Sequence, residues 1–274
     1  MTEPPLITRK TKTPGPLRSN SHLVIHTRQA QRLVEGRSEP GKPPIFGMLS
    51  FGRKMRSVWL SSEHDDPYAD WYLLQVEAAI GESHSLLQQN IRDLCSRISA
   101  TPSVHIDISI SGEPITVPLA FANPYGYMGA YLVADFDELA RLVLTARHVG
   151  LIDRKYAETL LQTCATTVRR SFHKSTQWQY SGVTRDDVRS GTAVAKKAAD
   201  LMGPLPAEYL SLAVRAKCAP AIRKAEPLLA SSQKPHKVPD EESGSRPNAD
   251  TISDDPSELA NQNAKQKAEE IRIA

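Results

Sequence analysis

The chain has 274 residues, of which 40% are apolar and 24% charged, with a formal net charge of +3. These proportions are ordinary for a soluble globular protein. No run approaches the roughly 18 consecutive apolar residues of a membrane helix, and the N-terminus lacks the layout of a signal peptide, so we expect a cytoplasmic protein with no membrane partner.

Charge is distributed unevenly along the chain. The formal charge is +8 over residues 1–58, −8 over 59–150, +6 over 151–230 and −3 over 231–274. Two basic blocks around an acidic middle are expected of a protein that binds a polyanion, and solvated surface charge gives the same pattern.

The first regular pattern begins near residue 21. Residues 1–20 are rich in Thr, Pro, Lys and Arg without periodicity, and we expect a disordered basic arm there. Residues 22–27 predict a strand, and 28–36 place Ala30, Leu33 and Val34 on one side of a short helix. The glycines and prolines of 36–44 then predict a loop.

A basic cluster lies in the next predicted helix, residues 46–60. Arg53, Lys54 and Arg56 are close in sequence to Trp59. Cations with an aromatic neighbour are typical of contact with nucleic-acid phosphates. A short amphipathic helix with its charges in water has the same pattern, so both interpretations stay open.

The longest predicted helix covers about residues 67–98. Asp66 is a helix-capping residue type and Pro67 takes the first helical position, which accounts for a His64-Asp65-Asp66 run that otherwise resembles a catalytic cluster. Its apolar stripe recurs at steps of three and four: Leu73, Val76, Ile80, His84, Leu87, Ile91, Leu94 and Ile98. This spacing predicts that His84 is a core histidine.

The clearest β pattern covers residues 104–121. Apolar and polar residues alternate from Val104 to Ile110, Gly112-Glu113-Pro114 turns the chain, and the alternation resumes at Ile115. We therefore predict an antiparallel hairpin at 104–121 with one apolar face.

Residues 121–155 are the predicted centre of the fold. The apolar run 130–134 predicts a strand, Asp135 and Glu138 match a capping box for a helix ending at Gly150, and Asp153 starts a second helix at 154–172. A strand, a helix, a tight loop and a helix, here at 129–172, is the layout of a ribbon-helix-helix protomer. In that fold, strands from two chains pair and enter the major groove of DNA.

Further helices are predicted at 184–202 and from 206 to before Pro220. We expect a single globular α+β domain at 21–228, mostly helical with a small antiparallel sheet. The composition beyond it predicts a disordered charged tail at 229–274, in which 257–271 has a weak helical pattern.

The sequence contains no enzyme signature. A phosphate-cradling Gly-x-x-x-x-Gly-Lys loop, a Gly-x-Ser-x-Gly elbow and a dinucleotide fingerprint are all missing. The three cysteines are odd in number and far apart, and the eight histidines show no metal-ligand spacing. We therefore expect neither an enzyme nor a bound metal, cofactor or small-molecule substrate.

Three segments carry a family resemblance: residues 121–155, the run Asp65-Asp66-Pro67-Tyr68-Ala69-Asp70-Trp71, and residues 23–36 with His26-Thr27-Arg28-Gln29-Ala30. Together they resemble the AcaB-like proteins encoded on bacterial integrative conjugative elements, over about residues 20–175. The resemblance implies a cytoplasmic accessory protein of mobile DNA whose relatives are ribbon-helix-helix-type transcriptional regulators.

These observations predict a homodimeric regulator that binds double-stranded DNA at the promoters of conjugation genes. The alternative is a non-catalytic accessory or scaffold factor that docks a protein partner. The candidate DNA-binding residues are Arg53, Lys54, Arg56, Arg147, Arg154, Lys155, Arg169, Arg170 and Lys174. The last three end the helix at 154–172, where cations also suit the helix dipole.

Overall fold

A computed structural model describes residues 20–100 and 103–223 of the protein. The predicted tail at 229–274 and all but the last residue of the predicted arm at 1–20 lie outside the described residues. Within the described part, no helix combines the length and the apolar character needed to cross a membrane.

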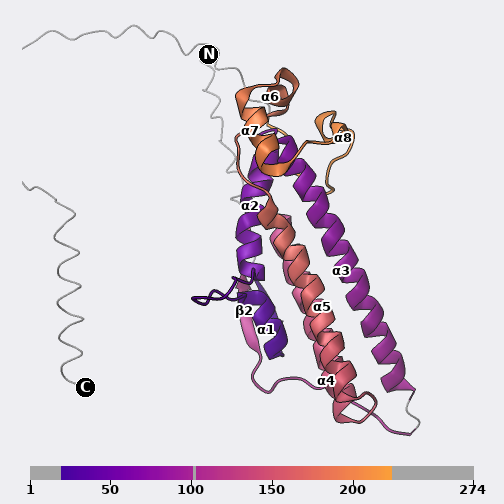
Figure 1. Cartoon of the computed structure of the whole chain (residues 1–274). Coiled ribbons are helices and arrows are strands. Elements are labelled where there is room, and N and C mark those ends of the chain that lie inside the picture. The colour runs from indigo at the N-terminus through magenta and orange to yellow at the C-terminus, as the bar shows by residue number, and fades with distance from the viewer. Residues whose placement is uncertain (1–19, 101–102, 224–274) are drawn as a thin grey trace, which may run out of the picture. The chain divides into compact units, whose positions relative to one another are not determined.

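Four long helices pack side by side and form the core (Figure 1). They are α2 (Met48–Glu63), α3 (Pro67–Ser99), α4 (Pro124–His148) and α5 (Arg154–Lys174). Each buries an apolar stripe against the others, as Leu73 of α3 and Phe136 of α4 illustrate with side chains fully inaccessible to solvent. Phe51 of α2 stacks on Phe172 of α5 with ring centroids 4.9 Å apart. The prediction of a mostly helical α+β fold is confirmed.

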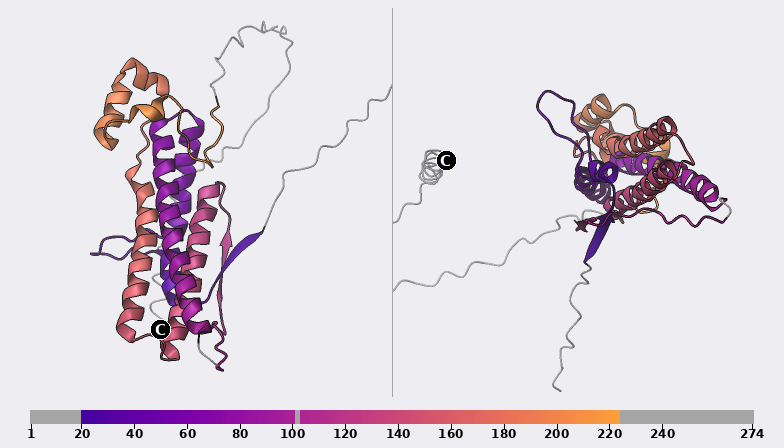
Figure 2. Two further views of the ribbon diagram at one scale, coloured as in Figure 1. Left: turned by 90° about the vertical axis from the view of Figure 1, so that its right-hand side faces the viewer. Right: turned by 90° about the horizontal axis from the view of Figure 1, so that it is seen from below.

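A two-stranded antiparallel sheet lies along one side of these helices (Figure 2). It pairs β1 (Ser21–Ile25) with β2 (Ile115–Leu119), and Ser21 lies opposite Leu119. The predicted hairpin at 104–121 is therefore wrong in its first half, because 104–111 forms no strand. There the N–H of Ser109 donates to Thr145 Oγ1 at 2.9 Å and that of Ser111 to His26 Nδ1 at 3.3 Å. β1 takes the place that this segment was expected to fill.

The strand predicted at 130–134 is also wrong, because these residues are helical and belong to α4. The helix starts earlier: Asn123 Oδ1 accepts the N–H of Gly126 at 3.0 Å. Gly129 marks close packing rather than a turn, since a Cβ there would lie 2.9 Å from the Phe51 ring. The ribbon-helix-helix layout at 129–172 thus keeps its two helices but not its strand. Asp135 is mid-helix and not a cap.

His84 does not lie in the core as predicted. Its side chain is 56% exposed, and its Nδ1 lies 2.7 Å from Asp135 Oδ2 of α4. The other residues of the α3 stripe from Leu73 to Ile98 are buried or packed against the core. The stripe therefore has the predicted direction, and His84 lies at its edge.

The shorter helices agree only in part with the helices predicted from the sequence. α1 (Arg28–Glu35) forms as predicted. Thr184 and Asp187 form a capping box where the next helix was expected to begin. The helix expected at 184–202 is divided by Gly191, whose φ is +64°, into α6 (Arg185–Ser190) and α7 (Ala193–Met202). Between residue 206 and residue 223, where the described residues end, only α8 (Ala207–Leu210) is helical, so the helix expected from 206 to before Pro220 is shorter than predicted. The short helix η1 (Ser175–Gln177) follows α5. In Figure 1, α6, α7 and α8 gather near the end of the bundle where α2 meets α3.

Candidate functional site

The nine predicted cations lie in three groups. Arg53, Lys54 and Arg56 are on α2, Arg147, Arg154 and Lys155 are at the turn between α4 and α5, and Arg169, Arg170 and Lys174 are in the last part of α5. The turn and the end of α5 are separated by the length of that helix, about 30 Å at about 1.5 Å per residue. The nine residues therefore do not form one continuous site.

Several of the nine already have partners. Lys54 Nζ lies 4.8 Å from the centroid of the Trp178 ring, and burial lowers the pKa of Lys54. Arg154 Nε donates to Glu158 Oε1 at 2.7 Å. Weaker contacts join Arg53 to Ser50 and Lys174 to Gln75. The exposed cations of the set, without a hydrogen-bond partner among the described residues, are Arg56, Arg147, Lys155 and Arg170.

One candidate, Arg169, converges with two arginines that were not predicted. Arg32, Arg37 and Arg169, which we call the arginine cluster, line a cavity of about 370 Å³ together with Gly36, Glu39 and Ile45. Arg32 comes from α1, Arg37 from the loop that follows α1, and Arg169 from α5. Segments far apart in the sequence therefore bring three positive charges to one cavity.

Arg32 is positioned by the way α1 is attached to α4. Asp137 Oδ1 of α4 accepts the N–H of Thr27 at 2.9 Å and its hydroxyl at 2.7 Å, and Oδ2 accepts the N–H of His26 at 3.0 Å. Thr27 Oγ1 in turn accepts the N–H of Ala30 and caps the helix. Since Ala30, Leu33 and Val34 are buried, Arg32 lies on the outer side of α1.

Arg37 is positioned by a tight reversal after α1. Gly36 ends the helix with φ +72°, a conformation that favours glycine. A Cβ on Gly36 would lie 2.2 Å from the carbonyl oxygen of Ile45, so the two chain segments approach as closely as their backbones allow. Arg37 and Ile45 exchange backbone hydrogen bonds of 2.9 and 2.8 Å. The loop is thereby fastened back on the end of α1.

Among the described residues, no carboxylate forms an ion pair with the arginine cluster, since Glu39 of the cavity lining is paired with Lys42. The side chains of Arg32 and Arg169 form no ion pair or hydrogen bond with the described residues, and the Arg37 side chain donates only to the carbonyl oxygen of Pro43, at 3.3 Å. The Nε atoms of Arg37 and Arg169 are buried and have no hydrogen-bond partner there. Burial lowers the pKa of Arg169, and the charges of Arg32 and Arg37 lower it further. This is the arrangement of an anion site.

An apolar hollow adjoins the cluster. It has a volume of about 180 Å³ and shares Arg32 and Arg169 with the first cavity. Its other lining residues are Gln29, Phe136, Leu161, Gln162 and Ala165. A ligand held by the arginines can therefore place an apolar part in this hollow against Leu161, which is partly exposed.

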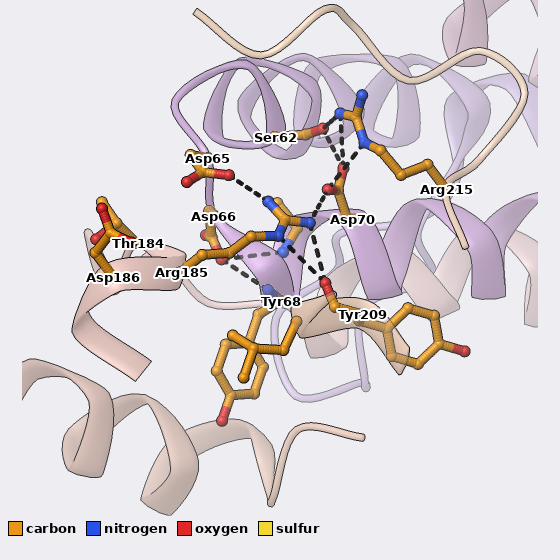
Figure 3. A network of polar contacts seen from close by, with 12 residues as sticks. Ser62, Asp65, Asp66, Tyr68, Asp70, Thr184, Arg185, Asp186, Tyr209 and Arg215 are labelled. Atoms are coloured by element: carbon orange, nitrogen blue, oxygen red, sulfur yellow. Dashed lines mark hydrogen bonds and ion pairs between the residues drawn. The ribbon is translucent and has the colours of Figure 1, made fainter. Parts of the chain in front are cut away.

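A second group of charged residues is a structural linkage (Figure 3). Asp70, fully buried, receives Arg185 and Arg215 and the hydroxyl of Ser62. Arg185 also contacts Asp65 and donates to the carbonyl oxygen of Tyr209. Because both guanidinium groups have partners inside the protein, this network fastens residues 185–215 to the α2–α3 turn rather than offering a free site.

The same segment is fastened at a second point. Glu77 accepts the N–H groups of Lys217 and Cys218 at 3.1 Å and the hydroxyl of Tyr125 at 2.8 Å. Burial, and then the bond to Glu77, raises the pKa of Tyr125. No group of three or more His, Cys, Asp or Glu side chains in the described residues is arranged to hold a metal ion.

Sequence patterns pointed to Arg169 but not to Arg32 or Arg37. Arg32 follows Arg28 by one helical turn on the polar face of a predicted helix, and Arg37 opens a loop rich in glycine and proline. These positions are ordinary for solvated arginines. Only the packing of α1 against α5 makes them part of a cluster.

Comparison with known proteins places the chain in a family. The family model described as "Transcriptional regulator AcaB" matches residues 13–223, more than half of the chain. The fold is similar to that of a solved structure titled "Crystal structure of selenomethionine-containing AcaB from uropathogenic E. coli", with a TM-score of 0.50 and 14% identity, over 70% of this chain and 94% of that chain. No curated protein matches. The chain belongs to the AcaB family of transcriptional regulators.

Proposed function

We propose that the protein is a DNA-binding regulator of conjugative-transfer genes on a bacterial integrative conjugative element, and that it binds double-stranded promoter DNA as a homodimer. The observation that carries this proposal is the match to a family of transcriptional regulators over residues 13–223, a range that contains all nine predicted cations. Their chemistry supports it, because Lys and Arg neutralise DNA phosphates.

Two of the three cation groups lie in the same part of the bundle. The stacked rings of Phe51 and Phe172 join the start of α2 to the end of α5, and Lys54 of α2 covers Trp178 just beyond α5. The group at the α4–α5 turn lies at the other end of α5. We therefore assign the first phosphate contacts to the exposed or half-buried arginines of α2 and α5: Arg53, Arg56, Arg169 and Arg170.

A transcriptional reporter tests the proposal in cells that express the full chain. The reporter carries the promoter of the transfer genes, and the wild-type protein is expected to change its transcription. Replacing Arg53 and Arg56 by Gln weakens this response, because each lost phosphate contact lowers DNA affinity. Replacing the exposed Lys196 and Lys197 of α7 by Gln removes the same two positive charges and should leave the response of the reporter unaltered. If expression of the wild-type protein does not change transcription of the reporter, the proposal is contradicted.

A non-catalytic accessory factor that docks a protein partner is the second candidate function. It is favoured by apolar side chains on the segment that was predicted to start the hairpin: Val104, Ile108 and Ile110 are 57%, 39% and 70% exposed. Apolar surface of this kind marks interaction sites. If Ile110→Ser lowers the frequency of conjugation while promoter binding stays at the wild-type level, this second function is supported.

A further inference from the structure

The arginine cluster presents more positive charge than the described residues balance. Its cavity has one acidic residue in its lining, Glu39, whose carboxylate lies 2.6 Å from Lys42 Nζ. Three guanidinium groups that face one cavity repel one another, and removing them partly from water adds to the cost. An anion that enters the cavity offsets both effects.

We propose that Arg32, Arg37 and Arg169 bind the phosphate group of a phosphorylated ligand, and that the adjoining apolar hollow receives part of the ligand's body. A phosphate matches the donors because a guanidinium fork forms paired hydrogen bonds with phosphate oxygens. The cavity of about 370 Å³ is large enough for this group. The first cavity supplies the charged donors, and the adjoining hollow adds the apolar residues that a ligand's body can contact.

The buried Nε atoms distinguish this site from the exposed cations. Arg56 and Arg170 stand in solvent, where water satisfies their donors, whereas the Nε groups of Arg37 and Arg169 touch neither water nor a described acceptor. Because Arg37 and Arg169 are partly buried, water screens their charges less than those of Arg56 and Arg170, so an anion in the cavity gains more here than at the surface. The site therefore favours a phosphate group that projects from its ligand.

Two sources supply such a group. One is a free organic phosphate, which binds whether or not the protein contacts DNA. The other is a backbone phosphate of bound DNA, and this source rests on the proposed function. The two are distinguished by measuring phosphate binding and DNA binding separately on the same variants of the full chain.

Phosphate binding is measured by thermal unfolding in inorganic phosphate and in phenyl phosphate, against sodium chloride of equal ionic strength. Both compounds should raise the unfolding midpoint of the wild type. Phenyl phosphate should raise it more, because its ring enters the apolar hollow and packs against Leu161. Arg169→Gln and Arg37→Gln should each weaken binding about tenfold or more, as expected for a lost charge-assisted hydrogen bond. Arg92→Gln, an equal change in charge on exposed α3 surface, is the control and should bind as the wild type does.

Arg37 lies in a loop, so its replacement keeps the test valid if Arg169→Gln fails to fold. Equal midpoints in the two phosphate compounds contradict the assignment of the apolar hollow. If the variants lose promoter affinity as well, with a salt slope reduced by about 1, the source is DNA. If the variants are no longer stabilised by the phosphate compounds but keep their affinity for the promoter, the ligand is a free organic phosphate.

Two outcomes separate this inference from the proposed function. A wild-type protein that is stabilised by phosphate but does not bind promoter DNA contradicts the function and supports the site. The opposite result has three parts: the wild type binds DNA, neither phosphate compound raises its unfolding midpoint, and both arginine variants keep the DNA affinity of the wild type. This result contradicts the proposed phosphate site and is compatible with the proposed function.

Discussion

Asp70 is the residue on which the buried polar network depends. Its carboxylate is fully buried and receives Arg185 and both donors of the Arg215 fork at 3.1 Å. Asp70→Asn removes the buried charge that Arg185 and the half-buried Arg215 share, and leaves Arg185 with Asp65 alone. We expect a loss of about 3–5 kcal/mol in the free energy of unfolding. Urea unfolding followed by tryptophan fluorescence measures it.

The matched control for that substitution is Asp186→Asn. Asp186 also pairs with an arginine, Arg189, at 2.9 Å, but both side chains are mainly exposed. Such pairs contribute little, so the urea midpoint should stay close to that of the wild type. Equal losses in the two variants contradict the role assigned to burial of Asp70.

Asp66 gives stability a dependence on pH. Burial raises the pKa of its carboxyl from 3.8 to about 6, although the N–H groups of Ala69 and Tyr68 bond to it and act in the opposite direction. A carboxyl with a higher pKa in the folded than in the unfolded chain holds its proton more tightly when folded. Its contribution to stability is therefore complete below its unfolded pKa of 3.8 and is lost as the pH rises through about 6.

Asp66→Asn removes this titration and keeps a residue type that caps helices. The variant should gain about 2 kcal/mol relative to the wild type between pH 4 and pH 7, from about 1.36 kcal/mol for each pKa unit. Urea unfolding of both proteins at pH 4, 5, 6 and 7 measures the gain. A difference that stays constant across this range contradicts the assigned pKa.

Single residues were predicted well where their role is local. Asp66 caps its helix as expected, because capping depends on neighbours within about one turn. The site depends on distant partners: Arg32 and Arg169 meet only because α1 packs against α5. One sequence contains no local signal for that meeting, and the same is true of His84 and Asp135.

Two helical glycines differ in their surroundings, and this difference can be tested. Gly52 of α2 faces the ring of Phe121, which a Cβ would approach to 2.2 Å, whereas a Cβ on Gly81 of α3 would meet nothing within 4 Å. Gly52→Ala should destabilise by about 1–3 kcal/mol through overpacking. Gly81→Ala should stabilise by about 0.5–1 kcal/mol, because alanine is the better helix former.

Thermal and urea unfolding of the two glycine variants measure these effects. The two substitutions add the same methyl group to helices of the same bundle, so each serves as the control for the other. If Gly52→Ala is as stable as the wild type, α2 and the Phe121 ring are not packed as described.

At the scale of elements, periodicity predicted the long helices and failed at short apolar runs. The stripe of α3 extends over many turns and fits no other structure. The run 130–134 is too short to separate strand from helix, and Gly126 and Gly129 resemble a turn in the sequence although they are contact points with Phe121 and Phe51. The pairing of β1 with β2 joins segments about 90 residues apart, which alternation alone does not specify.

The whole molecule is expected to be a dimer. The chain has a mass of 30.2 kDa, so light scattering after size exclusion should give about 60 kDa, twice that value. Many regulators bind paired half-sites because a two-fold axis presents the same cations to both halves. A measured mass of about one chain at micromolar concentration contradicts the homodimer. The protein would then be expected to bind a single DNA half-site.

DNA binding is the central claim at this scale, and a salt series tests it most directly. Fluorescence anisotropy compares a labelled promoter fragment of the transfer genes with unrelated DNA, from about 50 to 200 mM salt. We expect tighter binding to the promoter and a linear fall of log affinity with log salt, with a slope of about −0.9 for each phosphate engaged. Absence of binding to either DNA at the lowest salt would contradict a DNA-binding regulator.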